Sequence, residues 1–159
     1  MPVKVGGEKL SNVVVRRQVN RRPIDKDIQF VSGTITNSQT DTSLHNAPDS
    51  RTLVRIVGNL MVKSISGTDG SWSVLITKQQ QNRTPNTMSL SSGSHYTPES
   101  DVLWHGSGTF RESNDLINFQ VDVKGMRKMQ AGDDIYISFL GSAATIAAIN
   151  GSLSMFFKG

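Results

Sequence analysis

The sequence predicts an all-β protein, an eight-stranded antiparallel jelly-roll sandwich with a short flexible basic arm at its N-terminus. Three observations lead to this prediction. Apolar and polar residues alternate with a period of two over much of the chain. Turns rich in Gly, Ser, Asn and Thr separate these segments. No segment of ordinary length has a helical period, and only residues 143–148 suggest a helical turn. Some connections are long, which favours a Greek-key jelly roll over an up-and-down barrel.

The predicted arm, residues 1–27, carries all of the chain's net charge of +4. Two diarginines, Arg16-Arg17 and Arg21-Arg22, lie in it, and guanidinium groups bind phosphate through paired hydrogen bonds. We therefore predict sequence-independent binding of nucleic acid. The alternatives are a solvated tail that maintains solubility or a nuclear-import signal. The predicted nucleic-acid-binding residues are Lys4, Lys9, Arg16, Arg17, Arg21, Arg22 and Lys26.

The predicted body, residues 28–159, begins with a strand at 28–35 and a polar loop at 37–50. The β-branched run at 12–15, within the arm, is able to pair on a sheet edge. The longest predicted strand is 52–65, where Gly58 marks a bulge or bend. Its predicted core face is Val54, Ile56, Leu60 and Val62.

The second half of the body continues with predicted strands at 72–77, 117–123, 135–139 and 149–157. Long loops are expected at 78–101 and 105–115, the second after the short apolar run 102–104. The last strand has a clear core face, formed by Ile149, Leu153, Met155 and Phe157. Strands 52–65 and 149–157 also carry apolar residues on the opposite face. If exposed, these residues point to oligomeric contacts; the alternative is a bulkier core with loops folded over it.

The residues capable of chemistry form no recognisable catalytic pattern. The chain has no Cys, and His45, His95 and His105 lack metal-ligand spacing. Asp133-Asp134 is interpreted as a turn before a strand. We expect no enzymatic activity, no cofactor and no metal. No apolar run is long enough for a secretory signal or a membrane span, so we expect a soluble protein made in the cytoplasm.

Three segments resemble capsid proteins of small circular single-stranded DNA viruses from environmental samples. They are Ser50–Gly58 (SRTLVRIVG), Gln130–Phe139 (QAGDDIYISF) and Asn150–Lys158 (NGSLSMFFK). The resemblance implies a single jelly-roll subunit that assembles into an icosahedral shell, with its arm facing inward against the genome. Such proteins often begin with a denser Arg/Lys run, so this arm is expected to condense nucleic acid weakly.

The leading hypothesis is therefore a viral capsid protein that self-assembles around single-stranded DNA, without a membrane partner. Its expected location is the virion, after synthesis in the host cytoplasm and with nuclear import as an option. Loops 37–50, 78–101 and 105–115 would project outward or join subunits, and Arg55 and Lys63 would add charge to the inner surface. The alternative is a monomeric β-sandwich module that binds carbohydrate or nucleic acid, with Trp72, Trp104 or Tyr96 as a stacking platform.

Overall fold

The computed structural model describes residues 23–66, 70–88, 90, 101–110, 114–142 and 146–159. These residues form eight strands and no helix, which confirms the all-β prediction. The strands are β1 (Ile24–Ile35), β2 (Thr40–Asn46), β3 (Arg51–Ser66), β4 (Ser71–Gln79), β5 (Asp101–Thr109), β6 (Leu116–Met129), β7 (Asp134–Gly141) and β8 (Ile146–Lys158).

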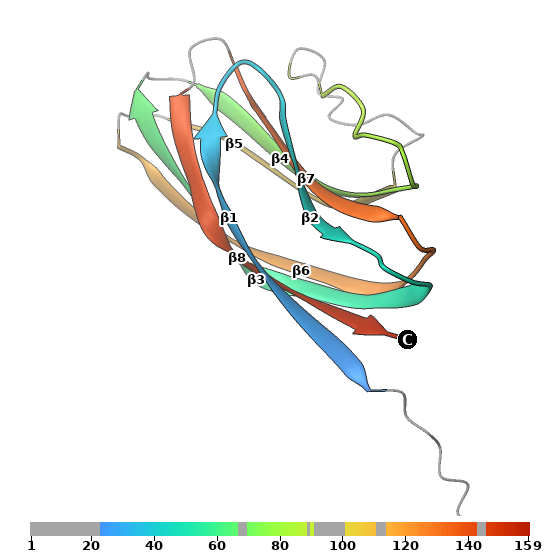
Figure 1. Ribbon diagram of the computed structural model, residues 1–159. Helices are drawn as coiled ribbons and strands as arrows, with labels where there is room; N and C mark the ends of the chain where they lie inside the picture. Colours follow the sequence, from blue (N-terminus) through green and yellow to red (C-terminus); the bar gives the residue numbers. More distant parts are fainter. Residues whose placement is uncertain (1–22, 67–69, 89, 91–100, 111–113, 143–145) are drawn as a thin grey trace, which may run out of the picture.

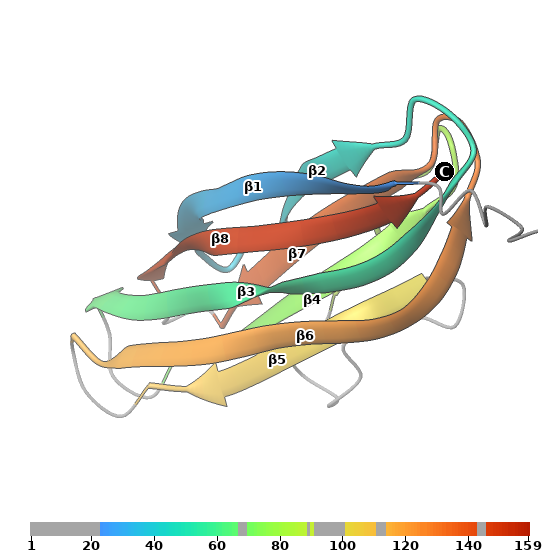
Figure 2. The same cartoon turned by 90° about the horizontal axis from the view of Figure 1, so that it is seen from below.

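The strands are arranged in two four-stranded antiparallel sheets that pack face to face (Figure 1). Sheet A has the order β1-β8-β3-β6, and sheet B has the order β2-β7-β4-β5 (Figure 2). Every connection except that between β4 and β5 crosses from one sheet to the other. This topology is compatible with the predicted jelly roll.

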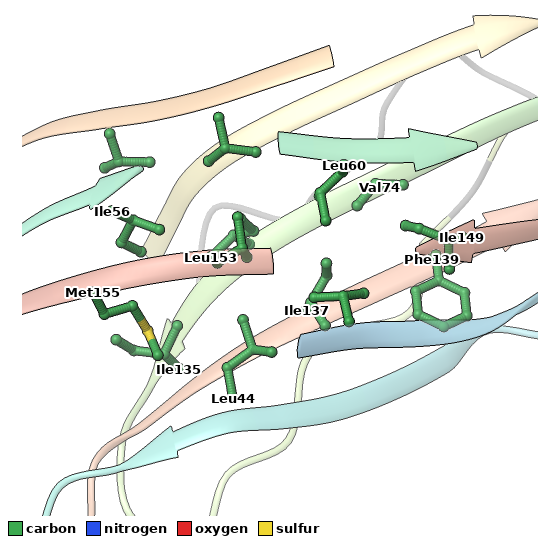
Figure 3. Close-up of a cluster of buried hydrophobic side chains, with 14 of the residues drawn as sticks. Leu44, Ile56, Leu60, Val74, Ile135, Ile137, Phe139, Ile149, Leu153 and Met155 are labelled. Carbon is green, nitrogen blue, oxygen red and sulfur yellow. The ribbon is translucent and has the colours of Figure 1, made fainter. Parts of the chain in front are cut away.

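The core lies between the sheets. Figure 3 shows Ile56 and Leu60 of β3 and Leu153 of β8 packed in one cluster with Ile137 and Phe139 of β7. The predicted core face of the last strand is confirmed, because the side chains of these four residues are no more than 1% exposed: Ile149, Leu153, Met155 and Phe157. The alternation of apolar and polar residues in the sequence therefore predicted correctly which side of β8 faces sheet B.

A bulge changes the predicted core face of β3. The register shifts between Leu53 and Arg55 relative to both neighbouring strands, β6 and β8. An extra residue reverses which side the following residue faces. Leu53 is therefore buried and Val54 only half-buried, whereas the sequence predicted the opposite for both.

Two predicted loops contain strands. Residues 40–46 form β2, which pairs with β7 at the edge of sheet B and buries only Leu44, so no alternation is visible in the sequence. Residues 105–109 belong to β5. A Cβ on Gly108 would lie 2.8 Å from the ring of Trp72, so glycine here leaves room for an indole packed on the strand.

Two further boundaries differ from the sequence prediction. Residues 146–148 were predicted to be helical but extend β8, where they pair with β1 and β3. Strand β1 begins at Ile24, inside the segment predicted as the arm. Residues 1–22, with the β-branched run 12–15, lie outside the described residues.

Candidate nucleic-acid interface

The outer face of sheet A, turned away from sheet B, is strongly basic. Among its described side chains there are six cations and one carboxylate, Asp122. We call this surface the basic face, and its cations are Lys26, Arg55, Lys63, Lys124, Lys128 and Lys158. Each cation occupies an outward position in the alternating pattern of its strand, and the four strands bring them together.

Strand register places three of these cations in one row across the sheet. Lys26 is paired with Phe156, Phe156 with Arg55, and Arg55 with Lys124. The Lys26 ammonium lies 5.8 Å from the centroid of the Phe156 ring, within the range of a cation–π contact. The row therefore crosses all four strands.

Asp122 neutralises part of this row. Its carboxylate accepts hydrogen bonds from Arg55 at 3.1 and 3.3 Å and lies 3.5 Å from the Lys124 ammonium. The hydrogen bond from Arg55 is the main reason that the pKa of Asp122 lies below its usual 3.8. Lys63 and Lys158 have no ion-pair partner among the described residues, so their charge is available to a ligand.

An apolar stripe borders the basic face on strand β1. It consists of Ile24, Ile28 and Phe30, whose side chains are 58%, 49% and 82% exposed. Together with Lys26, these three residues occupy successive outward positions of the strand. Large exposed apolar side chains grouped on one strand are typical of a surface that is covered by a partner.

The structure places one of the seven predicted arm contacts. Lys26 lies on β1, and the other six, Lys4, Lys9, Arg16, Arg17, Arg21 and Arg22, lie outside the described residues. Arg55 and Lys63 are exposed on the outer side of sheet A, away from the core as the sequence predicted. The sequence reading missed Lys124, Lys128 and Lys158, although each is next to a buried residue of β6 or β8.

Sheet B has a different outer surface, because its central strand β4 is buried on both sides. Trp72, Val74 and Ile76 face the core, whereas Ser73, Leu75 and Thr77 face away from it and are also buried. Residues 80–88 run along this outer side of sheet B (Figure 1).

Residues 80–88 are hydrogen-bonded to Gln39, the residue before β2. The backbone N–H of Met88 donates to the Gln39 carboxamide, whose Nε2 donates to the Asn86 carbonyl at 3.0 Å. Met88 itself is only 4% exposed. The described part of the predicted 78–101 loop therefore packs against its own subunit.

The two tryptophans named by the alternative hypothesis pack against phenylalanine rings. Trp72 is 2% exposed, with ring centroids 5.4 Å from Phe119 and 6.4 Å from Phe110. Trp104 is half-buried and stacks on Phe119 at 5.4 Å. The prediction that Trp72 stacks on a ligand is wrong, because the core of the sandwich covers its ring; Tyr96 lies outside the described residues.

His45 and the paired aspartates, Asp133 and Asp134, contact other groups of the sandwich. His45 Nδ1 lies 2.9 Å from Asp27 Oδ2, and the imidazole stacks on Phe157 at 4.2 Å. Asp133 and Asp134 follow the turn at Gly132, and Asp133 accepts a hydrogen bond from the Gln130 N–H at 2.9 Å. The turn interpretation is confirmed. No group of three potential metal ligands occurs within the described residues.

One shallow hollow of about 440 Å³ lies at the end of sheet B. Its walls are mainly carboxamide, hydroxyl and charged groups, with Tyr136 as the only aromatic side chain. Burial raises the pKa of the Tyr136 phenol, and the charges of Asp134 and Asp41 raise it further. The phenol is protonated at neutral pH, as that of an unperturbed tyrosine also is.

In the part of the chain that the structure describes, no helix has the length and apolar character needed to cross a membrane.

Comparison of the sequence with protein-family models and with curated proteins gives no match. Solved structures that the comparison returns include a pilus of Bacillus endospore appendages, with TM-score 0.40 and 13% identity over 86% of this chain and 89% of that chain. They also include the capsid protein VP2 of an infectious bursal disease virus subviral particle, with TM-score 0.42 and 11% identity over 88% of this chain. The chain spans 34% of that VP2. At these identities the similarity concerns the fold alone.

Proposed function

We propose that this protein is a viral capsid protein whose subunits self-assemble into a small icosahedral shell around a nucleic-acid genome. The observation that carries the proposal is the basic face of sheet A, which lies beside the strand to which the basic arm is joined. Sheet A would face the genome, and sheet B, under residues 80–88, would face outward.

Charge supports this orientation. Residues 1–27, which include Lys26 of the basic face, carry a net charge of +4. The basic face adds further cations, of which Lys63 and Lys158 have no ion-pair partner among the described residues. A polyanion held between neighbouring subunits would contact the arm and the basic face together, so that the two act as one surface. Binding of this kind depends on phosphates, is independent of base sequence and weakens steeply with salt.

The apolar stripe on β1 supports self-association, because such exposed groups are usually covered by a partner in the functional assembly. The resemblance of three segments to capsid proteins of small circular DNA viruses supports single-stranded DNA as the genome. The virion is then the site of function, and the proposed role involves no chemical step. In the alternative, a monomeric binding module, Trp72 is not available as a stacking platform because it is 2% exposed.

The test is the assembly state of the full-length protein produced in a recombinant host. We expect uniform particles in negative-stain electron microscopy, and light scattering should give a mass many times the 17.4 kDa of one chain. We also expect particles that contain nucleic acid resistant to nuclease until the shell is opened. A monomer at every salt concentration and pH tested would contradict the proposal.

A further inference from the structure

Strand β1 combines two features that a soluble monomer usually avoids. Within the described part of the chain it is the edge of sheet A and pairs with β8 alone (Figure 2). It also carries the apolar stripe Ile24, Ile28 and Phe30 on its outward side. An edge strand offers a row of backbone groups to another strand, and natural proteins normally protect such edges with charges, prolines or a covering segment.

We propose that β1 pairs antiparallel with β1 of a second copy of this chain, about a two-fold axis at Ile28. The two A sheets would then form one continuous eight-stranded sheet. In this register Ile28 lies opposite the partner's Ile28. Lys26 lies opposite the partner's Phe30, and Asp27 opposite the partner's Gln29.

The side chains of β1 are complementary to one another in this register. Lys26 already lies over the Phe156 ring at 5.8 Å, and the partner's Phe30 gives its ammonium a second ring. The Gln29 carboxamide donates to the Asp27 carboxylate at 3.1 Å within one chain, so the same pair of groups is compatible across the new strand pair. The two isoleucines at the axis cover each other.

Neighbouring registers are less complementary. An axis at Lys26 places two ammonium groups opposite each other, and an axis at Asp27 does the same with two carboxylates. An axis at Gln29 moves Lys26 opposite Ser32 and takes it away from the partner's Phe30. The avoidance of like-charge pairs, together with the Lys26–Phe30 and Asp27–Gln29 pairs, therefore favours the axis at Ile28 and a second copy as the occupant of this edge.

Cysteine cross-linking tests this register directly, because the natural chain has no Cys. Residues directly opposite on antiparallel strands have Cα atoms about 4.5 to 5.5 Å apart, a distance that a disulfide spans. The full-length I28C variant is expected to form a disulfide-linked dimer under mild oxidation. The matched control is S32C, which is exposed on the same side of β1 but far from its own copy in this register.

A second pair of variants tests the apolar stripe. F30Q in the I28C background is expected to reduce the rate of cross-linking roughly tenfold, since it removes an aromatic contact on each side of the axis. L116Q in the same background is the control, because Leu116 is an exposed apolar residue on β6, at the opposite edge of sheet A. It should leave the rate unchanged. Circular dichroism verifies that each variant is folded.

The inference is overturned if I28C cross-links no faster than S32C, whether the edge is covered by the arm, by another partner or by nothing. Cross-linking of Q29C in place of I28C would likewise contradict the axis at Ile28. A decrease in cross-linking with L116Q as large as with F30Q would show that Phe30 does not contribute specifically to the β1 pair. Particles without I28C dimers would contradict this inference alone, and I28C dimers without particles would contradict the proposed shell alone.

Discussion

The two sheets use their outer faces differently. In sheet B the outward residues of strand β4 are as well buried as its core residues, and residues 80–88 run along that side of the sheet. In sheet A the outward residues alternate with buried ones and leave cations and apolar groups at the surface. The described structure thus has one face covered by its own chain and one face that is open, and the open face is the one that is available to partners.

The largest change in the free energy of unfolding is expected from a mutation on the outer side of a central strand of sheet B, compared with one on the outer side of a central strand of sheet A. L75A removes a side chain that is 4% exposed on the outer side of β4, and we expect it to lower the free energy of unfolding by about 2–4 kcal/mol. The matched change M61A, at a half-buried outward position of β3, should cost about 1 kcal/mol or less. Urea unfolding measures both. Equal decreases would show that the outer faces do not differ as described.

A smaller effect is expected where the two sheets are joined by polar groups. Asp27 of β1 accepts a hydrogen bond from Gln29 and lies 2.9 Å from the His45 imidazole of β2. D27N weakens this link between sheet A and sheet B, and we expect the free energy of unfolding to fall by about 1 kcal/mol at neutral pH. D49N, at an exposed carboxylate paired with Arg51, is the control and should have little effect. Thermal unfolding distinguishes the two.

The dependence of DNA binding on salt concentration tests whether the basic face, and not sheet B, contacts DNA. K63Q/K158Q removes two exposed cations of sheet A, which should weaken the binding of single-stranded DNA and reduce the salt slope by about 0.7 for each phosphate that these cations neutralise. R83Q removes one exposed cation at the end of sheet B and should leave the slope unchanged. Fluorescence anisotropy at several salt concentrations gives the slopes. An equal decrease for R83Q would mean that DNA binding is not confined to sheet A.

The smallest effect concerns Asp122 on the basic face. Because its pKa is lowered in the folded state, chiefly by Arg55, its ionised form stabilises the fold at higher pH. This contribution disappears as the pH falls through the lowered folded-state pKa, and it is small because the carboxylate is exposed. Carboxyl NMR titration should place the Asp122 midpoint below 3.8, and R55Q should return it toward that value. An unchanged midpoint in R55Q would exclude Arg55 as the cause.

Strands and their core faces could be predicted from the sequence where apolar and polar residues alternate clearly. They could not be predicted where sheet edges, glycines or bulges obscure the alternation. Strand β8 has an apolar residue at each core position, so its face was predicted correctly. Strand β2 was missed because it buries only Leu44 at the edge of sheet B. Strand β5 was missed because Gly106 and Gly108 leave room for tryptophan rings instead of adding side chains.

The candidate site was predicted only in part, for a different reason. Alternation within a strand indicates that Lys124 and Lys158 point away from the core. It does not indicate that β6 and β8 are both neighbours of β3, since strand order in the sheet is set by long-range pairing. The basic face therefore exists only after the chain folds, although each of its cations is visible in the sequence.

Strand β8 has a consequence for how the protein is made. It is the last of the eight strands, yet it lies between β1 and β3 in the interior of sheet A. Until residues 146–158 leave the ribosome, β1 has no strand to pair with in sheet A and β3 lacks one of its two neighbours. Such long-range pairing is slow, and unpaired strand edges promote aggregation during synthesis. A nascent subunit therefore cannot complete sheet A, or the surface for assembly that sheet A carries, before β8 has been synthesised.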